Sequence, residues 1–301
     1  MKIDLSKIGT EQQNKNTMHI DTLETEAMIR LINQEDQAVI DAVGAAVPQI
    51  AKAVDAIYET ILNGGRLVYI GAGTSGRLGV LDASEVLPTF GMGEEAVVGL
   101  IAGGDVALRH PVEAAEDNET IVVEDLKRID FNENDILCAI ASSGRTPYCV
   151  GGLKYARSLN AKTISLACVA DSVIAQYADY PIEAVVGQEV VTGSTRMKSG
   201  SATKMVLNML STGAMIKYGK VYGNLMVDVK TSNAKLVERA KGIIMKATGV
   251  DYDRAAYLLD ASGNHVKTAI VMQETDTTQA EARALLEANE DRIALAIANR
   301  G

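Results

Sequence analysis

Apolar residues in the middle of the chain occur in short, continuous runs rather than in alternation with polar ones. Five such runs are present, at residues 66–71, 96–103, 135–142, 162–169 and 181–187. Each has the length of a strand and is apolar throughout, which is typical of strands covered on both faces. Segments with helical spacing separate the runs, so strand and helix alternate. The pattern predicts a three-layer α/β/α fold with a five-stranded parallel sheet and right-handed crossovers.

The N-terminal part of the chain lacks this alternation. Residues 1 to about 20 are polar without a clear period, so we expect an extended arm there. Apolar residues at helical spacing then predict one helix over residues 22–36 and a longer one over residues 37–64. Asn63, Gly64 and Gly65 would end the second helix, because these residue types tolerate left-handed backbone conformations.

The C-terminal part is predicted to be helical. A long helix is expected over residues 194–219, and several short amphipathic segments without a strand-like run fill residues 233–298. This change in pattern predicts three parts. They are N-terminal arm and helices over residues 1–50, an α/β domain over residues 51–230, and a small helical bundle over residues 231–301.

Composition and charge exclude several classes of ligand. The 301 residues include no tryptophan, 4% are aromatic, and 29 basic against 39 acidic residues give a net charge of −10. These values argue against a nucleic-acid partner and mean that an anionic small ligand needs a locally built site. No apolar run approaches the length of a signal peptide or a membrane span, so we expect a cytoplasmic protein without a membrane partner.

The three cysteines do not suggest a metal site. Cys138, Cys149 and Cys168 cannot all pair, and they form neither a CxxC motif nor a cluster with histidine. Cys138 and Cys168 lie in apolar runs and are expected to be core residues. No metal is predicted.

A glycine-rich loop follows the first predicted strand. Residues 71–76 spell Gly-Ala-Gly-Thr-Ser-Gly, which matches the GxGxxG fingerprint of dinucleotide-binding folds. Such folds also place an acidic residue at the end of the second strand, where it binds a ribose hydroxyl. The nearest acid beyond the second predicted strand is Asp105, which comes too late. The loop is therefore not assigned to NAD, and no cofactor is predicted.

A second loop of similar character follows the third predicted strand. Both loops are small, rich in hydroxyl groups, and expected to lead into helices at the carboxyl ends of parallel strands, where ligands of open α/β sheets bind. Free backbone N–H groups at a helix N-terminus, together with hydroxyl groups, bind phosphate. Either loop alone could merely cap its helix, but two such loops in one sheet favour a phosphate-bearing ligand. The candidate residues are Gly73, Thr74, Ser75, Ser142, Ser143 and Thr146.

This pair of loops resembles the SIS family of phosphosugar-binding domains. In that family, the serine and threonine of the second loop hold the sugar phosphate. The resemblance assigns that role to Ser143 and Thr146, with Ser142, and places Thr74 and Ser75 in the same pocket.

Longer motifs sharpen the resemblance. Residues 71–85, 141–148, 190–204 and 220–229 look like the N-acetylmuramic acid 6-phosphate etherase family, and the similarity covers nearly the whole chain. The resemblance implies a carbon–oxygen lyase of cell-wall amino-sugar recycling. Such an enzyme converts N-acetylmuramic acid 6-phosphate to N-acetylglucosamine 6-phosphate and D-lactate by elimination and then hydration. It also implies a homodimer, because related SIS proteins complete their pockets across a dimer.

The family's catalytic residues correspond to Glu85 and Glu116. Glu85 would donate a proton to the departing lactate oxygen, and Glu116 would act as acid or base at C2. The residues alone do not separate Glu116 from Glu113, which lies three positions earlier. Arg196 or Lys198 is expected to help bind the carboxylate of the lactyl group.

Two other functions remain compatible with these motifs. An isomerase of another sugar phosphate would also use a carboxylate at C2 but would release no lactate. A non-catalytic sugar-phosphate sensor would bind its ligand without converting it, as do the glucokinase regulatory proteins, which resemble this family.

Overall fold

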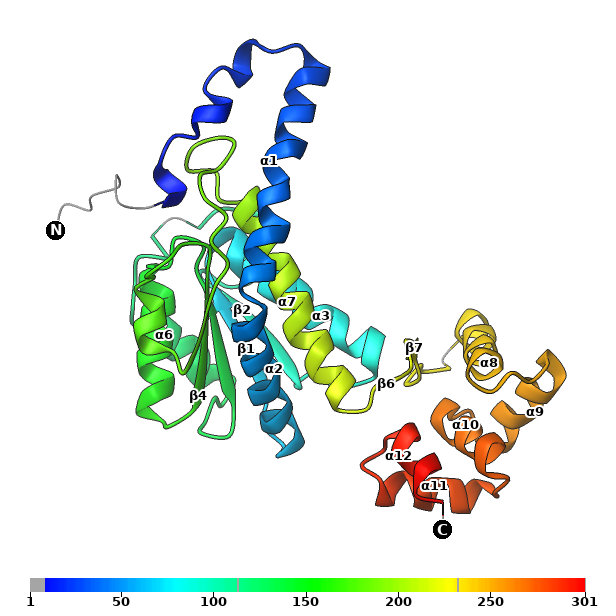
Figure 1. Cartoon of the computed structure of the whole chain (residues 1–301). Coiled ribbons are helices and arrows are strands. Elements are labelled where there is room, and N and C mark those ends of the chain that lie inside the picture. Colours follow the sequence, from blue (N-terminus) through cyan, green and yellow to red (C-terminus); the bar gives the residue numbers. More distant parts are fainter. Residues whose placement is uncertain (1–8, 113, 232, 301) are drawn as a thin grey trace. The chain divides into compact units, whose positions relative to one another are not determined.

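The computed structural model describes residues 9–112, 114–231 and 233–300 (Figure 1). The chain divides into two compact units. The first comprises Met1–Ser84 with Glu95–Ser211, and the second comprises Glu85–Glu94 with Thr212–Gly301. The predicted boundary near residue 230 falls inside the second unit. Residues 1–8 of the predicted arm lie outside the described residues.

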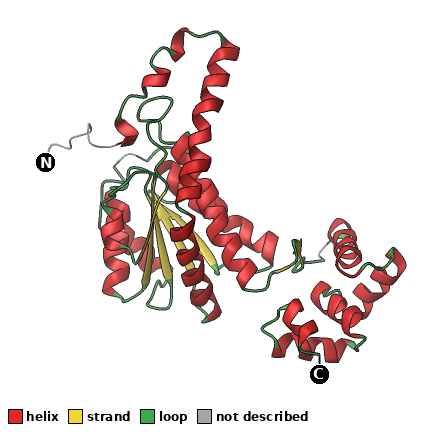
Figure 2. Ribbon diagram, viewed as in Figure 1, coloured by secondary structure: helices red, strands yellow, loops and turns green. Residues whose placement is uncertain are grey.

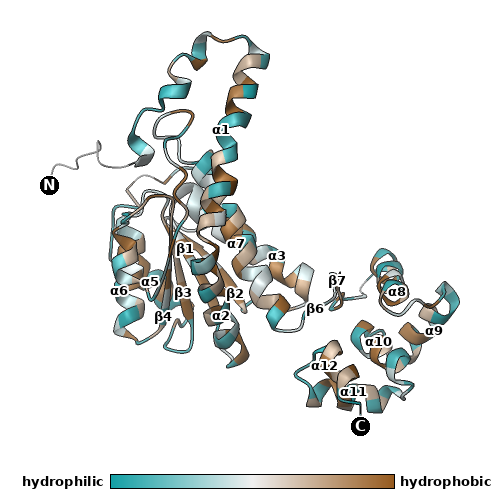
Figure 3. Cartoon of the chain, in the orientation of Figure 1, coloured by the Kyte–Doolittle hydropathy of each residue, from teal (hydrophilic) through white to brown (hydrophobic). Residues whose placement is uncertain are grey.

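The first unit contains the predicted five-stranded parallel sheet. Its strands have the order β2-β1-β3-β4-β5, and every neighbouring pair is parallel. The strands are β1 (Leu67–Gly71), β2 (Val97–Ile101), β3 (Ile136–Ile140), β4 (Lys162–Ala167) and β5 (Tyr180–Glu183). All five predicted strands are confirmed. Every residue of β1 and β3 is buried, which is why these strands read as continuous apolar runs; Figure 3 shows the hydrophobic colouring of the sheet.

Helices cover both faces of this sheet (Figure 2). On one face, α5 (Ile121–Arg128) and α6 (Pro147–Ser158) pack over a cluster that includes Ile70 and Leu137. On the other face, α3 (Gly73–Phe90) contacts Tyr69 and Ile140, the neighbours nearest to Gly79. Side chains of successive strand residues point to opposite faces of the sheet, so Tyr69 and Ile70 pack against different layers of helices.

The first unit has further helices. They are α1 (Thr25–Ala45), α2 (Val47–Leu62), α4 (Val106–Arg109), the 3-10 helix η5 (Ile174–Tyr177) and α7 (Lys198–Lys217), which continues into the second unit.

The predicted break between the first two helices is in the wrong place. Helix α1 runs without interruption through Asp36 and Gln37, and the break comes at Ala46. Pro48 lies in the first turn of α2. It has no backbone N–H and its ring clashes with the carbonyl of Gly44, so the helix cannot continue through it.

The N-terminal arm is not simply extended. From Gly9 onward, where the structure describes it, the arm contains three short 3-10 helices, η2 (Gly9–Glu11), η3 (Lys15–Thr17) and η4 (Ile20–Thr22). The arm docks on the segment that follows β5: the Thr17 hydroxyl donates to the Val190 carbonyl at 2.8 Å, and the Gly193 amide donates to the Thr10 carbonyl at 3.3 Å.

A buried ion pair connects α1 to the start of α7, and the arm hydrogen-bonds to it. The Lys198 ammonium group lies 3.2 Å from the Glu35 carboxylate, and its side chain is only 3% exposed. Asn14 and Asn16 of the arm donate to the same carboxylate at 2.6 and 2.9 Å. Burial raises the pKa of Glu35, but the hydrogen bonds from Asn16, Asn14 and Lys198 outweigh it, so the pKa lies below its ordinary value.

The second unit contains the short helices that were predicted for the C-terminal part. These are α8 (Ala234–Thr248), α9 (Tyr252–Ala261), α10 (Val266–Thr275), α11 (Gln279–Ala288) and α12 (Ile293–Ala298). They enclose a separate hydrophobic core, which also contains Val227 and Val229. A two-stranded hairpin of β6 (Val221–Tyr222) and β7 (Leu225–Met226), which the sequence did not predict, precedes the bundle. In the described part of the chain, no helix has both the length and the apolar character that crossing a membrane requires.

The Glu35 network, formed by Glu35, Lys198, Asn14 and Asn16, predicts a measurable difference in stability between the wild type and a Glu35 variant. Replacing Glu35→Gln removes the charge opposite buried Lys198, and we expect the free energy of unfolding to fall by about 1–3 kcal/mol at neutral pH. Because the folded-state pKa is lowered, this stabilisation is present above the ordinary value of 4.5 and is lost as pH falls through the folded-state pKa. Denaturant titrations at several pH values should therefore show the two proteins converging in acid.

Glu26→Gln is the matched control, because Glu26 pairs with Arg30 on the same helix and both side chains are largely exposed. This variant should change stability by less than about 0.5 kcal/mol. A constant difference between wild type and Glu35→Gln from neutral to acidic pH would contradict the assignment.

Candidate functional site

The two hydroxyl-rich loops meet at one edge of the sheet. Strands β1 and β3 are paired neighbours, with Gly71 opposite Ile140, so they end level with each other. The Ser75 and Ser142 hydroxyl oxygens, which follow these strands, lie 3.4 Å apart. The register of a single strand pair therefore brings both loops to one place.

The loop after β3 has a shape that requires glycine. Gly144 has a φ of +71°, and a Cβ atom added there would clash with Cβ of Ser172. Thr146 occupies the N-cap position of α6, but its side chain makes no capping hydrogen bond. The capping explanation for this threonine therefore does not hold, and its hydroxyl remains available to a ligand.

A cavity of about 400 Å³ opens where the loops meet. Its lining contains all six predicted loop residues and the predicted catalytic residue Glu116. The full lining is Glu11, Ala72, Gly73, Thr74, Ser75, Glu116, Asp117, Ser142, Ser143, Arg145, Thr146, Pro147 and Thr195.

Contacts with helix α6 fix the segment that carries Glu116. The Glu116 carbonyl accepts a hydrogen bond from the Tyr148 amide at 3.0 Å. Gly151 of the same helix lies so close to the Glu119 carbonyl oxygen that an added Cβ atom would clash with it. The Glu116 side chain itself is exposed. Glu113, the alternative from sequence, lies outside the described residues.

The charged side chains of the cavity are not engaged elsewhere. Glu11, Glu116 and Arg145 line it, and within the described residues no hydrogen bond or ion pair reaches their side chains. Three carboxyl groups, counting Asp117, face one guanidinium group. A phosphate here must therefore be held chiefly by amides and hydroxyls rather than by a cluster of cations.

Glu85 is absent from this lining. It is exposed and lies ten residues after Ser75 on α3, which is roughly 15 Å of helical rise. The helix is continuous from Gly73 to Phe90. Gly79, within this helix, packs closely on β1, because an added Cβ would lie 3.0 Å from Tyr69.

Arg196 and Lys198 are also outside the lining. Arg196 is exposed in the turn before α7, and Lys198 is buried in its ion pair with Glu35. Thr195, which precedes Arg196, does line the cavity. Arg145 belongs to the loop after β3, and it is this residue whose guanidinium group lines the cavity.

Sequence reasoning missed Glu11 entirely. The residue lies in the polar arm, where no periodicity or motif singles out one position. Only the docking of the arm on the segment after β5 brings its carboxyl group to the loops.

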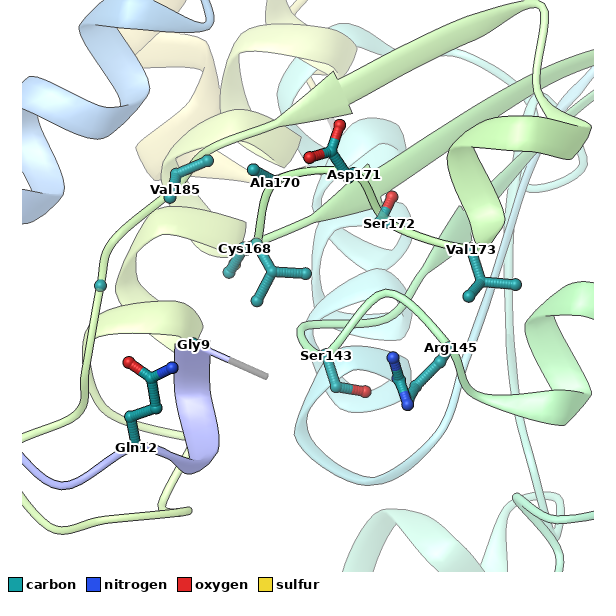
Figure 4. A pocket seen from close by; sticks show the side chains of 12 residues that line it. Gly9, Gln12, Ser143, Arg145, Cys168, Ala170, Asp171, Ser172, Val173 and Val185 are labelled. Atoms are coloured by element: carbon teal, nitrogen blue, oxygen red, sulfur yellow. The ribbon is translucent and has the colours of Figure 1, made fainter. Parts of the chain in front are cut away.

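Figure 4 shows a second cavity of about 400 Å³. It adjoins the first, since Ser143 and Arg145 line both. Its other walls are the loop of residues 168–173, Val185 with Gly187, and Gly9 with Gln12 of the arm.

The loop of residues 168–173 is held in place from β5. The Glu183 carboxylate accepts the amides of Asp171 and Ser172 at 3.1 and 2.8 Å. Cys168 is buried as predicted, and burial raises the pKa of its thiol to about 11. The thiol is therefore neutral near pH 7 and contributes an apolar wall.

Comparison with protein families places the loops in known domains. The glucokinase regulatory protein N-terminal SIS domain matches residues 49–157, and the SIS domain matches residues 108–213. Among solved structures, a protein of Escherichia coli CFT073, solved in a complex, superposes with a TM-score of 0.50 at 16% identity, covering 67% of this chain and 97% of that one. A Bacteroides fragilis protein named for a phosphosugar isomerase of capsule formation gives a TM-score of 0.50 at 25% identity, covering 66% and 93%. The structural likeness supports the α/β fold.

Curated relatives extend over almost the whole chain. A protein of Klebsiella aerogenes named N-acetylmuramic acid 6-phosphate etherase is 54% identical over 299 residues, which is 99% of this chain and 100% of the relative. A protein of the same name from Clostridium botulinum (strain Loch Maree) is 52% identical over 295 residues, or 98% of each chain. With this identity over its full length, the chain belongs to the N-acetylmuramic acid 6-phosphate etherase family.

Proposed function

We propose that this protein cleaves the D-lactyl ether of N-acetylmuramic acid 6-phosphate, giving N-acetylglucosamine 6-phosphate and D-lactate in cell-wall amino-sugar recycling. The observation that carries the proposal is the cavity in which two hydroxyl-rich loops converge with the Glu116 carboxyl group, which has no partner among the described residues. The family to which the chain belongs supports the same assignment.

The phosphate would sit on the two loops. Amides at the start of α3 donate to its oxygens, and the hydroxyls of Ser75, Ser143 and Thr146 add further hydrogen bonds. Helix α6 begins with Pro147, which has no N–H, and its Tyr148 amide already donates to the Glu116 carbonyl, so the loop before α6 contributes through its hydroxyls. Arg145 is the cation placed to meet the carboxylate of the lactyl group, because its guanidinium forms a fork that fits a carboxylate. A contribution of Arg196 or Lys198 remains a prediction.

The reaction follows from the substrate's chemistry. An alkyl ether resists direct hydrolysis because an alkoxide is a poor leaving group. Opening of the sugar ring makes C1 an aldehyde, which acidifies the C2 proton. A base removes that proton, lactate leaves from C3 as an acid protonates its oxygen, and water then adds at C3. In this proposal, Glu116 acts at C2 and Glu85 protonates the departing oxygen.

Glu85 is best supplied by a second copy of the chain. The C3 atom is only a few bonds from the phosphate, whereas Glu85 lies roughly 15 Å of helix beyond Ser75 in its own chain. A homodimer would bring the exposed Glu85 of one protomer to the cavity of the other. Ile29 and Ile40 on α1 support a dimer, because they are 54% and 57% exposed and, about three helical turns apart, share one face.

The proposal places the protein in the cytoplasm. Its three cysteines are buried and free, which suits a reducing compartment.

Thr146→Val tests the phosphate loops. The change keeps the side-chain shape but removes a hydroxyl that caps nothing, so we expect the Kd for N-acetylglucosamine 6-phosphate to rise about tenfold at nearly unchanged stability. Thr278→Val is the matched control. Thr278 forms a true capping box in α11, so this change should cost about 1 kcal/mol of stability and leave affinity unaltered. Calorimetric binding and thermal unfolding separate the two effects, and the reverse pattern would refute the phosphate assignment.

Release of D-lactate from N-acetylmuramic acid 6-phosphate tests the reaction itself, with Glu116→Gln as the key variant. In this variant the rate of lactate release should fall by about 10²–10⁴-fold, and deuterium from heavy water should no longer enter C2 of the sugar. The control is Glu119→Gln on the same segment, because Glu119 makes a half-exposed ion pair with Lys154. An isomerase or a sensor would release no lactate from wild-type protein.

Mixed dimers test the position of Glu85. Glu85→Gln and Glu116→Gln should each be inactive alone. If the two glutamates of one site come from different protomers, random mixing of the two variants should restore about a quarter of wild-type activity. Mixtures that stay inactive, although exchange of subunits is verified, would place both glutamates in the same chain.

A further inference from the structure

The arm brings the Glu11 carboxyl group to the cavity. We infer that Glu11 is the acid–base group that opens the sugar ring. The inference rests on the proposed function and extends it, because ring opening must precede the step at C2 and neither Glu116 nor Glu85 is assigned to it.

The position of Glu11 is well defined. The Thr10 carbonyl and the Thr17 hydroxyl bond to the segment after β5 on either side of it. Its carboxyl group lies over Gly193, where an added Cβ would stand 3.2 Å from Oε2 of Glu11, and Gly193 has a φ of +76°. The side chain is half-buried and, within the described residues, makes no hydrogen bond or ion pair. Glu11 is therefore held at the cavity without a structural partner.

Ring opening needs proton transfer at two oxygens. The O1–H bond breaks, a C1=O1 double bond forms, the C1–O5 bond breaks, and O5 gains a proton. A carboxyl group can accept the O1 proton at one oxygen while it donates a proton to O5 from the other, so the group ends the step as it began. The step needs no other reactant.

Glu11 and Glu116 reach the cavity from independent supports. Glu116 is carried by the segment docked on α6, whereas Glu11 is carried by the arm docked on the segment after β5. The remaining carboxyl group of the lining, that of Asp117, adjoins Glu116 in sequence and belongs to the same segment docked on α6. The O5 atom is fewer bonds from the phosphate than C2 or C3. A carboxyl group held beside the phosphate loops, on its own support, is therefore placed to act at O1 and O5 while Glu116 acts at C2.

The exchange between the two anomers of N-acetylglucosamine 6-phosphate isolates this step, because they interconvert only through the open-chain aldehyde. NMR exchange spectroscopy with wild-type protein should show accelerated interconversion. Glu11→Gln should lose at least about tenfold of that acceleration and about a hundredfold in lactate release. Its Kd for the sugar phosphate should stay within about threefold of wild type.

Two control variants make the result specific. Glu116→Gln should keep the anomer exchange while losing lactate release. Lys15→Gln, an exposed change elsewhere in the arm, should leave both rates unaltered.

Three outcomes would overturn the inference. They are wild-type protein that does not accelerate anomer exchange, a Glu11→Gln variant that exchanges as fast as wild type, or one that no longer binds the sugar phosphate. Failure of the proposed function is separate, because it would appear as wild-type protein that releases no lactate.

Discussion

The pairing of β1 with β3 is the constraint on which the site depends. These fully buried parallel strands end level with each other, so the loops that follow them meet, with the Ser75 and Ser142 hydroxyls 3.4 Å apart. Neither loop alone makes a phosphate site of this kind. Together they supply the N-terminus of α3 and several hydroxyl groups, which can bind an anion in a protein with a net charge of −10.

Around this pair of loops, the fold arranges segments that have little regular secondary structure of their own. The Glu116 segment is held by the Tyr148 amide and by the close approach of Gly151, and the N-terminal arm is held by Thr10, Thr17 and the Glu35 network. Each support is a packing or hydrogen-bonding contact with other parts of the first unit. Carboxyl groups can thus remain without partners in the cavity, because the backbone contacts rather than the carboxyl groups fix these segments.

The charge of the cavity also bears on the chemistry. With one guanidinium and three carboxyl groups in the lining, the cavity differs from phosphate sites built on lysine and arginine clusters. Other cations of the first unit are engaged elsewhere: Lys198 pairs with Glu35 in a buried ion pair, and Arg77 donates to the Ala107 and Leu108 carbonyls. Carboxyl groups therefore outnumber cations in the lining, which suits the several proton transfers of the proposed reaction.

The sequence by itself determined the five strands, the C-terminal helices and the two loops, because burial on both faces and helical periodicity leave local patterns. It did not determine the break at Ala46, which depends on Pro48 rather than on periodicity, or the hairpin of residues 221–226, whose strands are too short to leave a pattern. Only the tertiary structure decided that Glu11 and Arg145 line the cavity. It also decided that Lys198 forms a buried ion pair with Glu35, and that α3 is continuous from Gly73 through Glu85. These outcomes depend on contacts between residues far apart in the chain, such as Thr17 with Val190 and Glu35 with Lys198, and no local pattern encodes them.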